Sequence, residues 1–394
     1  MKVLMIAPHP FLTNRGSPLN VYTKVKTLSE LGHHITLITY PEGRDIPGIK
    51  IIRVPLIPFL RNIPIGLSIH KIVYDLLLLL KGSRIVRKNR FDVIHAHEID
   101  GAIIGALLKN KCKIIHKFKP LLYYDMHSIL SEQMQNKGYY SIFLNTLCKY
   151  IENYAYKDSD RLLMISPSFK DRLAKFNQDY KSLFIPDIPA LKEETIDQEL
   201  YNDLKGKIKE DTVFLYMGNL EKYQGVDLLI QAFKIVEESV DNVALMIVGG
   251  RDKDFDTLRE LIGKLEVKKV YIYSQQPLEK MPTYLKFSDI VISPRLLGTN
   301  IPYKIYPYIR MGKPLIATNI PAHHLILENN KNALLCSVDS TDMANKMLLL
   351  MNDESLKERL GKGAKELFNS SFSPEIYKNK LITLYGINLD RGHV

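Results

Sequence analysis

The sequence is poor in cysteine and contains none of the patterns in which cysteine and histidine bind a metal. Its three cysteines, Cys112, Cys148 and Cys336, lie far apart in 394 residues and form no CxxC or Cys/His pair. This spacing excludes a zinc or iron–sulfur site and a disulfide-stapled fold. It predicts buried free thiols in a reducing compartment.

The sequence also lacks a long run of apolar residues without charge. Its most apolar stretch, residues 63–80, contains His70, Lys71 and Asp75, whereas a spanning helix needs about 20 apolar residues. The apolar start of the chain leads into a turn with no cleavage-type site, so we expect no targeting segment. We therefore expect a cytoplasmic protein that can also associate peripherally with the inner face of the cell membrane.

Acidic residues are scarce in the first half of the chain. The net charge is 54 − 43 = +11; residues 1–190 carry 27 − 15 = +12 and residues 191–394 carry 27 − 28 = −1. This asymmetry indicates an anionic partner for the first half. The basic stretch 81–90 follows an apolar helical pattern at 69–80, which favours an anionic membrane surface. The alternative is a packed helix with a solvated basic end. Because no nucleic-acid motif is present, we expect no DNA or RNA partner.

Short apolar strands alternate with helical patterns along the whole chain, which predicts an α/β fold of two Rossmann-like domains facing a cleft. We expect the first domain at residues 1–188, a linker at 189–208 and the second domain at 209–372. In detail, the pattern predicts a helix at 101–108, a strand at 111–118, and helices alone after residue 318.

The segment Ser293–Thr318 carries the strongest local signal for an anion site. We expect a helix over 302–311 with the loop Gly298–Asn300 before it. Thr299 or Asn300 would cap this helix, whose free N–H groups suit a phosphate. Lys304 would add a positive charge one turn into the helix. The alternative is a plain capped helix with a solvated lysine.

Further motifs follow one another in a fixed order. They are DVIHAH (Asp92–His97), YDMH (Tyr124–His127), YMGNLEKYQG (Tyr216–Gly225), IVGG (Ile247–Gly250) and PLEKMPTYL (Pro277–Leu285). With the Ser293–Thr318 segment, they resemble the retaining glycosyltransferases of the GT-B fold, family 4, of the type called glycosyl transferases group 1. The resemblance covers nearly the whole chain.

This resemblance implies transfer of a hexose from a nucleotide-diphosphate sugar, such as a UDP- or GDP-sugar, with retained anomeric configuration. The acceptor would be a glycan, lipid-linked or polysaccharide acceptor of the cell envelope. It implies no cofactor and no metal, because helix dipoles and basic side chains would stabilise the leaving diphosphate. It places the donor mainly on the second domain and the acceptor on the first, with a C-terminal helix at 373–394 crossing back to the first domain.

Candidate residues follow from the same resemblance. His127 matches the histidine that approaches the transferred sugar and is the expected catalytic residue. The expected donor-site residues are Arg15, Gly16, Asn219, Gly249, Gly250, Arg251, Arg295, Gly298, Thr299, Asn300 and Lys304. Arg295 would offer a bidentate fork to a phosphate. The sequence contains neither a G-x-G-x-x-G fingerprint nor a D-x-D metal motif.

Four positions depart from the family pattern. Thr299 and Pro307 stand where the family carries two glutamates, and Asn219 and Gln224 stand where it carries an arginine and a lysine. These departures keep two rivals open. One is a non-catalytic GT-B-fold binding or scaffold subunit. The other is a sugar-nucleotide epimerase, which would need more carboxylates than these loops contain.

Other polar residues near His127 are weaker candidates. At period two, His95 and His97 share a face of their strand, with His97 nearer the ligand-binding end and His95 in the core. We expect Asp125 to point to the face opposite His127. Glu98 and Asp100 alone are poor support for a metal site.

Overall fold

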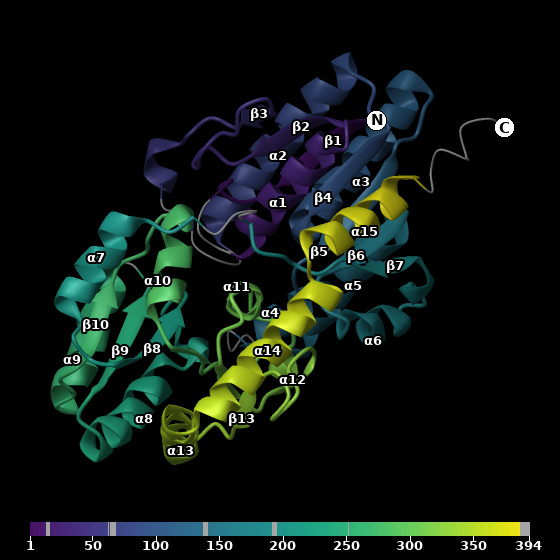
Figure 1. The fold of residues 1–394 in the computed structure, drawn as a ribbon. Helices are drawn as coiled ribbons and strands as arrows, with labels where there is room; N and C mark the ends of the chain where they lie inside the picture. Colours follow the sequence, from purple (N-terminus) through teal and green to yellow (C-terminus); the bar gives the residue numbers. More distant parts are fainter. Residues whose placement is uncertain are drawn as a thin grey trace. The chain divides into compact units, whose positions relative to one another are not determined.

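The computed structural model describes residues 1–12, 16–61, 63, 68–136, 141–190, 195–250 and 252–386. The chain forms two compact units, of which the first comprises Met1–Pro186 with Tyr377–Val394 and the second Asp187–Ile376 (Figure 1). The chain thus returns to the first unit at its C-terminal end. Each unit contains one sheet.

The first unit is built on a parallel sheet of seven strands in the order β3-β2-β1-β4-β5-β6-β7. Its strands are β1 (Lys2–Ala7), β2 (His34–Thr39), β3 (Lys50–Arg53), β4 (Val93–His97), β5 (Leu121–Met126), β6 (Arg161–Met164) and β7 (Ser182–Phe184). The central strands are continuous apolar runs because helices cover both faces of a parallel sheet. In β4, for example, all five residues are buried.

Helices connect most of these parallel strands, an arrangement for which right-handed crossovers are the rule. They are α1 (Gly16–Glu30), α2 (Ile69–Lys88), α3 (Glu98–His116), α4 (Leu130–Asn136), α5 (Ile142–Asp158), α6 (Phe169–Ala174) and, at the end of the chain, α15 (Pro374–Gly386), with short 3-10 turns η1 (Pro58–Leu60) and η2 (Asp179–Lys181). Side chains of α2 and α3 form one core with β1, β2 and β4, and α5 and α6 form another with β5 and β6. The Ser68 hydroxyl caps α2 by accepting from the Lys71 N–H.

The second unit repeats this plan with six parallel strands in the order β10-β9-β8-β11-β12-β13. The strands are β8 (Thr212–Met217), β9 (Val243–Val248), β10 (Val270–Tyr273), β11 (Ile290–Ser293), β12 (Leu315–Thr318) and β13 (Leu334–Cys336). Its helices are α7 (Gln198–Lys207), α8 (Val226–Ser239), α9 (Asp252–Lys264), α10 (Met281–Phe287), α11 (Ile305–Arg310), α12 (Pro321–His324), α13 (Ser340–Asn352) and α14 (Glu354–Ser371), with η3 (Lys222–Gln224) and η4 (Leu278–Lys280). One apolar core under α8 and α13 joins the six strands with α9 and α14.

Three details differ from the expectation drawn from the sequence. The predicted strand at 111–118 is the end of α3, which runs to His116 instead of ending at 108. The predicted linker at 189–208 contains α7, in which the Tyr201 ring packs on Phe287. The stretch after residue 318 contains the strand β13 in addition to helices.

Within the described residues, no helix combines the length and apolar character needed to cross a bilayer.

Candidate functional site

The candidate donor residues of the second unit gather at the point where the strand order of its sheet reverses. Strand order passes from β8 to β11 at this point, and open α/β sheets bind ligands beyond the carboxyl ends of the strands at such a switch. The loop after β8 (218–225) carries Asn219, and the loop after β11 (294–304) carries Arg295 and Lys304. The loop after β9 begins with Gly249 and Gly250.

Glycines let these three loops approach one another through their backbones. Gly249 has a φ of 137°, and a Cβ there would lie 1.8 Å from the carbonyl oxygen of Gly218. Gly225 has a φ of 72°, and a Cβ there would lie 1.9 Å from the carbonyl oxygen of Pro294. Only glycine fits both the left-handed backbone and this spacing. The loop after β8 is therefore packed between the loops after β9 and β11.

Lys304 lies at the centre of this arrangement and is buried. Its Nζ donates to Oε1 of Gln224 at 3.0 Å and lies 3.7 Å from the centroid of the Tyr216 ring. Burial, and then the charge of Arg295, hold the pKa of Lys304 well below its usual range. No carboxylate of the described residues forms an ion pair with it. A buried lysine without a counter-charge gains its proton more easily when an anion binds beside it, so this position among glycine loops is suited to an anionic ligand.

The guanidinium of Arg295 donates to carbonyl groups of its own loop and is not turned outward for a ligand. Nε donates to the carbonyl of Leu297 at 2.8 Å, and Nη1 donates to the carbonyl of Asn300 at 3.1 Å. Its guanidinium lies over the Tyr223 ring, 5.3 Å from the centroid. Gly298 has a φ of 143°, and a Cβ there would lie 2.3 Å from Nη2. Arg295 thus holds the loop 297–300 closed around its guanidinium.

The expected helix cap at Thr299 or Asn300 is wrong. Helix α11 begins at Ile305, the residue before it is Lys304, and no side chain caps it. The Asn300 side-chain oxygen accepts instead from Nη2 of Arg295 at 3.1 Å. The helix that starts at the switch point is α8, which follows Gly225 and has no side-chain cap. Its N–H groups are the ones that a phosphate could meet here.

The two remaining donor-loop residues have local roles. The carbonyl of Asn219 accepts from the Tyr216 hydroxyl at 2.5 Å, and its side-chain oxygen accepts from the Glu221 N–H at 3.2 Å. Gly250 has a φ of 79° and packs on Leu220. Gly16 is the first residue of α1 in the other unit. Arg15 and Arg251 lie outside the described residues.

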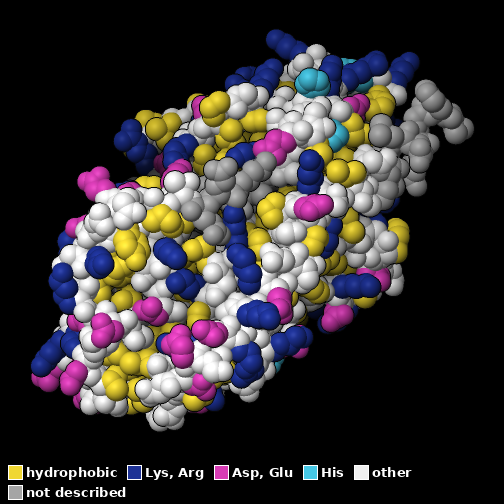
Figure 2. Space-filling model, in the orientation of Figure 1, with side chains coloured by type: hydrophobic (Ala, Val, Ile, Leu, Met, Phe, Trp, Pro, Cys, Tyr) yellow, Lys and Arg dark blue, Asp and Glu magenta, His cyan; other side chains and the backbone are white. Residues whose placement is uncertain are grey.

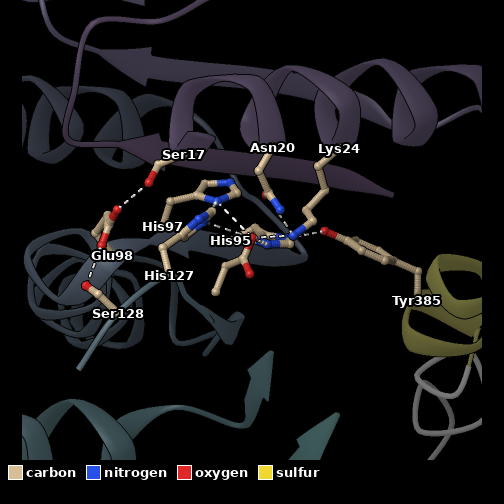
Figure 3. A network of polar contacts seen from close by, with 10 residues as sticks. Ser17, Asn20, Lys24, His95, His97, Glu98, His127, Ser128 and Tyr385 are labelled. Atoms are coloured by element: carbon tan, nitrogen blue, oxygen red, sulfur yellow. Dashed lines mark hydrogen bonds and ion pairs between the residues drawn. The ribbon is translucent and has the colours of Figure 1, made fainter. Parts of the chain in front are cut away.

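In the first unit, His127 belongs to a buried cluster on β4 and β5, beside the point between β1 and β4 where the strand order reverses (Figure 3). His95 and His97 lie on β4, Asp125 lies on β5, and His127 follows β5 directly. Oδ2 of Asp125 is 2.9 Å from Nδ1 of His97 and 3.5 Å from Nε2 of His127. The two histidine nitrogens are 3.3 Å apart. The expectation that Asp125 points away from His127 is wrong, because residues two apart on a strand share a face.

Lys24 completes the cluster, and sequence analysis missed it. From α1, its Nζ forms an ion pair with Oδ2 of Asp125 and donates to Oδ1 of Asn20 at 3.2 Å. Burial opposes ionisation of Asp125, but Lys24 and the imidazoles hold its pKa well below its usual range. Burial lowers the pKa of His95 and His97 and keeps both neutral. The cluster is thus one ion pair with the two neutral rings of His95 and His97 beside it.

His95, His97 and Asp125 are also groups that bind metals, and their ligand atoms lie within 4.8 Å of one another. The Lys24 ammonium, however, already contacts the same carboxylate oxygen. Its charge opposes the entry of a cation into a fully buried site. We interpret the cluster as an ion-pair network rather than a metal site.

Glu98 and Asp100 serve separate partners instead of forming a site together. Glu98 has a φ of 61°, which is uncommon for a residue other than glycine. Its carboxylate accepts from the Ser17 hydroxyl at 2.8 Å and from the Ser128 hydroxyl at 3.3 Å. Asp100 forms an ion pair with Lys71. Glu98 therefore ties the segments after β4 and β5 to the start of α1.

Two family models match the chain and between them cover most of it. The model described as glycosyl transferases group 1 matches residues 197–367. The model described as glycosyltransferase family 4 matches residues 16–184. Each match falls within one of the two units.

Several curated proteins are similar along most of their length. An uncharacterized glycosyltransferase of Methanocaldococcus jannaschii is 25% identical over 95% of this chain and 95% of its own. N-acetyl-alpha-D-glucosaminyl L-malate synthase of Bacillus anthracis is 23% identical over 79% of both chains. UDP-Gal:alpha-D-GlcNAc-diphosphoundecaprenol alpha-1,3-galactosyltransferase of Escherichia coli is 20% identical over 80% of both.

Solved structures share the fold at low sequence identity. Sucrose-phosphate synthase of Thermosynechococcus elongatus superposes with a TM-score of 0.81 at 16% identity, over 99% of this chain and 100% of its own. HepE of Anabaena in complex with UDP superposes with a TM-score of 0.75 at 15% identity, over 98% and 100%.

Proposed function

The chain belongs to the glycosyltransferases of group 1 and family 4, with their two-domain α/β GT-B fold, and on that premise we propose that it transfers a sugar from a nucleotide-diphosphate donor to a cell-envelope glycan. The donor is a UDP- or GDP-sugar, the acceptor is lipid-linked or a polysaccharide, and the anomeric configuration is retained. The relative that acts on a diphosphoundecaprenol-linked sugar supports this acceptor class. The neighbour that holds UDP supports this donor class.

The observation that carries the donor proposal is the Lys304 side chain at the switch point of the second sheet. It is buried, it lies beside the start of α8 through Gln224, and it pairs with no described carboxylate. A diphosphate would supply the missing counter-charge and accept from the first N–H groups of α8. These groups would also stabilise the charge that develops on the leaving diphosphate.

A thermal-shift panel of UDP, GDP and ADP tests the donor site. We expect one diphosphate at millimolar concentration to raise Tm by several degrees, since a ligand at 100 times its Kd adds about 2.7 kcal/mol. Lys304→Met, which keeps the packing on Tyr216, should abolish this shift. Lys313→Met is the matched control, because Lys313 is a half-buried lysine of the same unit that donates to the Ser288 carbonyl. A shift that survives Lys304→Met would contradict the assignment.

No metal and no further cofactor takes part in the proposed reaction. With Lys304 and the α8 N–H groups on the diphosphate, EDTA should leave the transfer rate unchanged. Activity that EDTA removes and Mg²⁺ restores would overturn this part of the proposal. The configuration of the product at its anomeric carbon, read by NMR, tests retention separately.

His127 is the proposed catalytic residue of the first unit, where it would contact the transferred sugar. Its imidazole is held by Asp125 in a buried polar cluster, an environment in which histidine acts near neutral pH. His127→Ala should lower kcat by roughly 100-fold or more if it contacts the reacting sugar. Nucleotide binding to the second unit should persist in this variant.

A non-catalytic binding subunit is the second candidate. The Arg295 fork is committed to the loop carbonyls, and neutral side chains stand at Thr299, Pro307, Asn219 and Gln224. Hydrolysis of the donor sugar separates the two candidates. A scaffold would bind the nucleotide and hydrolyse none.

Contact with an anionic membrane surface is the last part of the proposal, together with a cytoplasmic location on the inner face of the cell membrane. Four apolar residues form one exposed stripe along α2, namely Ile69, Ile72, Leu76 and Leu80. The basic residues Arg84, Arg87, Lys88 and Arg90 follow it and are exposed. Figure 2 shows Lys and Arg gathered at the upper end of the first unit. An apolar stripe with a cationic end is suited to anionic lipid headgroups.

A further inference from the structure

A line of polar contacts crosses the interior of the first unit from its C-terminal helix to His127 (Figure 3). The hydroxyl of Tyr385, on α15, lies 2.7 Å from Nδ1 of His95. Nε2 of His95 faces Oδ2 of Asp125 at 3.6 Å, and the same oxygen lies 3.5 Å from Nε2 of His127. Tyr385, His95 and Asp125 are all buried. Donor and acceptor binding as proposed above use neither Tyr385 nor His95.

Tyr385 and Asp125 together set which nitrogen of His95 carries the proton, because the Tyr385 hydroxyl can either donate to Nδ1 or accept from it. Burial lowers the pKa of His95, so the ring is neutral with a single N–H. Burial raises the pKa of Tyr385 well above its usual range, so its hydroxyl keeps its proton. When this hydroxyl donates to Nδ1, the ring proton lies on Nε2 and points toward Asp125. The opposite tautomer would turn a lone pair toward an ionised carboxylate, which is repulsive in a medium of low dielectric constant.

Asp125 connects this arrangement to His127. Its Oδ2 accepts from Nδ1 of His97 at 2.9 Å and pairs with Lys24, so the carboxylate is held from several sides. The N–H dipole of His95 also points its positive end toward the same oxygen. A carboxylate fixed in this way favours the His127 tautomer with its proton on Nε2, the nitrogen that faces Oδ2.

We propose that Tyr385 and His95 are positioning residues which, through Asp125, fix the tautomer and ring orientation of His127. In this tautomer Nδ1 of His127 is the acceptor of the ring, and Nε2, turned toward Asp125, is its donor. The catalytic consequence rests on the proposed function, whereas the control of the tautomer does not. Helix α15 thereby takes part in the site of a sheet that lies almost 300 residues earlier in the sequence.

Imidazole nitrogen NMR on the full-length protein tests this control directly. In the unmodified protein we expect both His95 and His127 as pure Nε2–H tautomers in long-range proton–nitrogen spectra. Tyr385→Phe removes only the hydroxyl, so Nδ1 of His95 loses its hydrogen-bond partner; the His95 nitrogen signals should shift, and the His127 signals should shift with them. His95→Gln removes the imidazole that contacts Asp125 and should also shift the His127 signals. Loss of the corresponding signals in His95→Gln and in His127→Gln assigns the two rings.

Tyr123→Phe is the matched control. Its hydroxyl is another buried one, and it donates at 3.4 Å to the carbonyl of Leu384, the neighbour of Tyr385 on α15. This variant loosens the same helix without removing the group that meets His95, so both imidazole patterns should remain. If Tyr123→Phe reproduces the change, the effect comes from docking of α15 and the proposal is overturned. Spectra that stay unchanged in Tyr385→Phe and in His95→Gln overturn it as well.

Kinetics give the second readout. Tyr385→Phe should lower kcat by roughly tenfold with KM unchanged, the size expected when a general acid–base group is misplaced rather than lost. Tyr123→Phe should keep the original kcat. If the unmodified protein transfers no sugar, the proposed function fails, and the imidazole spectra still decide whether Tyr385 controls the tautomer of His127.

Discussion

The most unusual residues of the first unit are Lys24 and Asp125, a fully buried ion pair. Removing two charges from water costs several kcal/mol per ion, and only close geometry and further hydrogen bonds repay it. Here His97 supplies such a bond to the same carboxylate oxygen, and Asn20 supplies one to the ammonium. Because hydrophobic replacements are often no less stable, this pair is better explained by the orientation it gives the histidines.

His323, in the second unit, makes folding sensitive to acid. Its Nδ1 donates to the Thr318 carbonyl at 2.7 Å, and its Nε2 accepts from the Ser293 hydroxyl at 2.9 Å, so the ring is neutral. Burial above all lowers its pKa to about 4. The unfolded chain therefore binds a proton near pH 6.5 that the folded chain binds only near 4. Stability should fall as pH drops through this window.

We expect His323→Gln to reduce that loss. Between pH 7 and pH 5, the contribution of one such histidine is about 2 kcal/mol, from 1.36 kcal/mol per pKa unit. The free energy of unfolding in urea should accordingly drop less in the variant than in the parent over this range. His95 and His97 contribute alike in both proteins, so the comparison isolates His323. Equal drops would contradict the neutral, buried ring.

Individual residues were predictable from the sequence where the backbone alone determines their role. Gly249 and Gly298 follow strands, and their left-handed backbone was implied by their position in turns. The partners of Lys24 and Tyr385 were not predictable, because each lies on a helix whose contacts join strands roughly 100 and 290 residues away. The one available signal for Lys24 was its i, i+4 spacing from Asn20 on the apolar side of α1.

At the scale of elements, buried parallel strands were readily predicted and boundaries were not. The run at 111–118 has the apolar pairs of a strand, but Ile114 is 80% exposed because the helix α3 continues through it. Helix α7 has a polar sequence in which Leu204 is the buried residue, so the segment was assigned to a linker. For such segments the tertiary contacts, absent from a single sequence, determine the structure.

Gly249 tests whether the packed loops matter to the donor site. Gly249→Ala would place a Cβ 1.8 Å from the Gly218 carbonyl oxygen at a φ of 137°, so one loop must move. We expect destabilisation by roughly 1–3 kcal/mol and loss of the nucleotide-dependent rise in Tm. Gly263→Ala, in α9 with nothing within 4 Å of the new methyl group, is the control. It should be neutral or stabilising by about 0.5–1 kcal/mol, and a similar loss of binding there would contradict the loop argument.

On the scale of the whole molecule, charge divides along the same line as the fold. The excess positive charge lies in residues 1–190, nearly the span of the first unit, and both signs are mixed on the face of the second unit that Figure 2 shows. The charge asymmetry of the sequence therefore coincides with the division into units, and an anionic partner of the first unit stays a prediction. The sequence could not predict that the α2 stripe faces outward, because the buried face of α2, with Tyr74 and Leu78, has the same apolar composition.

The α2 stripe gives the prediction for the molecule as a whole. In sedimentation with vesicles, the protein should bind phosphatidylglycerol strongly, bind phosphatidylcholine weakly, and lose binding as salt screens the basic residues. Ile72→Gln combined with Leu76→Gln should weaken binding by roughly tenfold or more, since burying each side chain is worth about 1.5–3 kcal/mol. The control pair is Ile142→Gln with Phe143→Gln, two residues of α5 that are 86% and 79% exposed. If the α5 pair weakens binding and the α2 pair does not, α5 is the membrane face. If the unmodified protein binds neither lipid, the charge of the first unit serves a soluble anion.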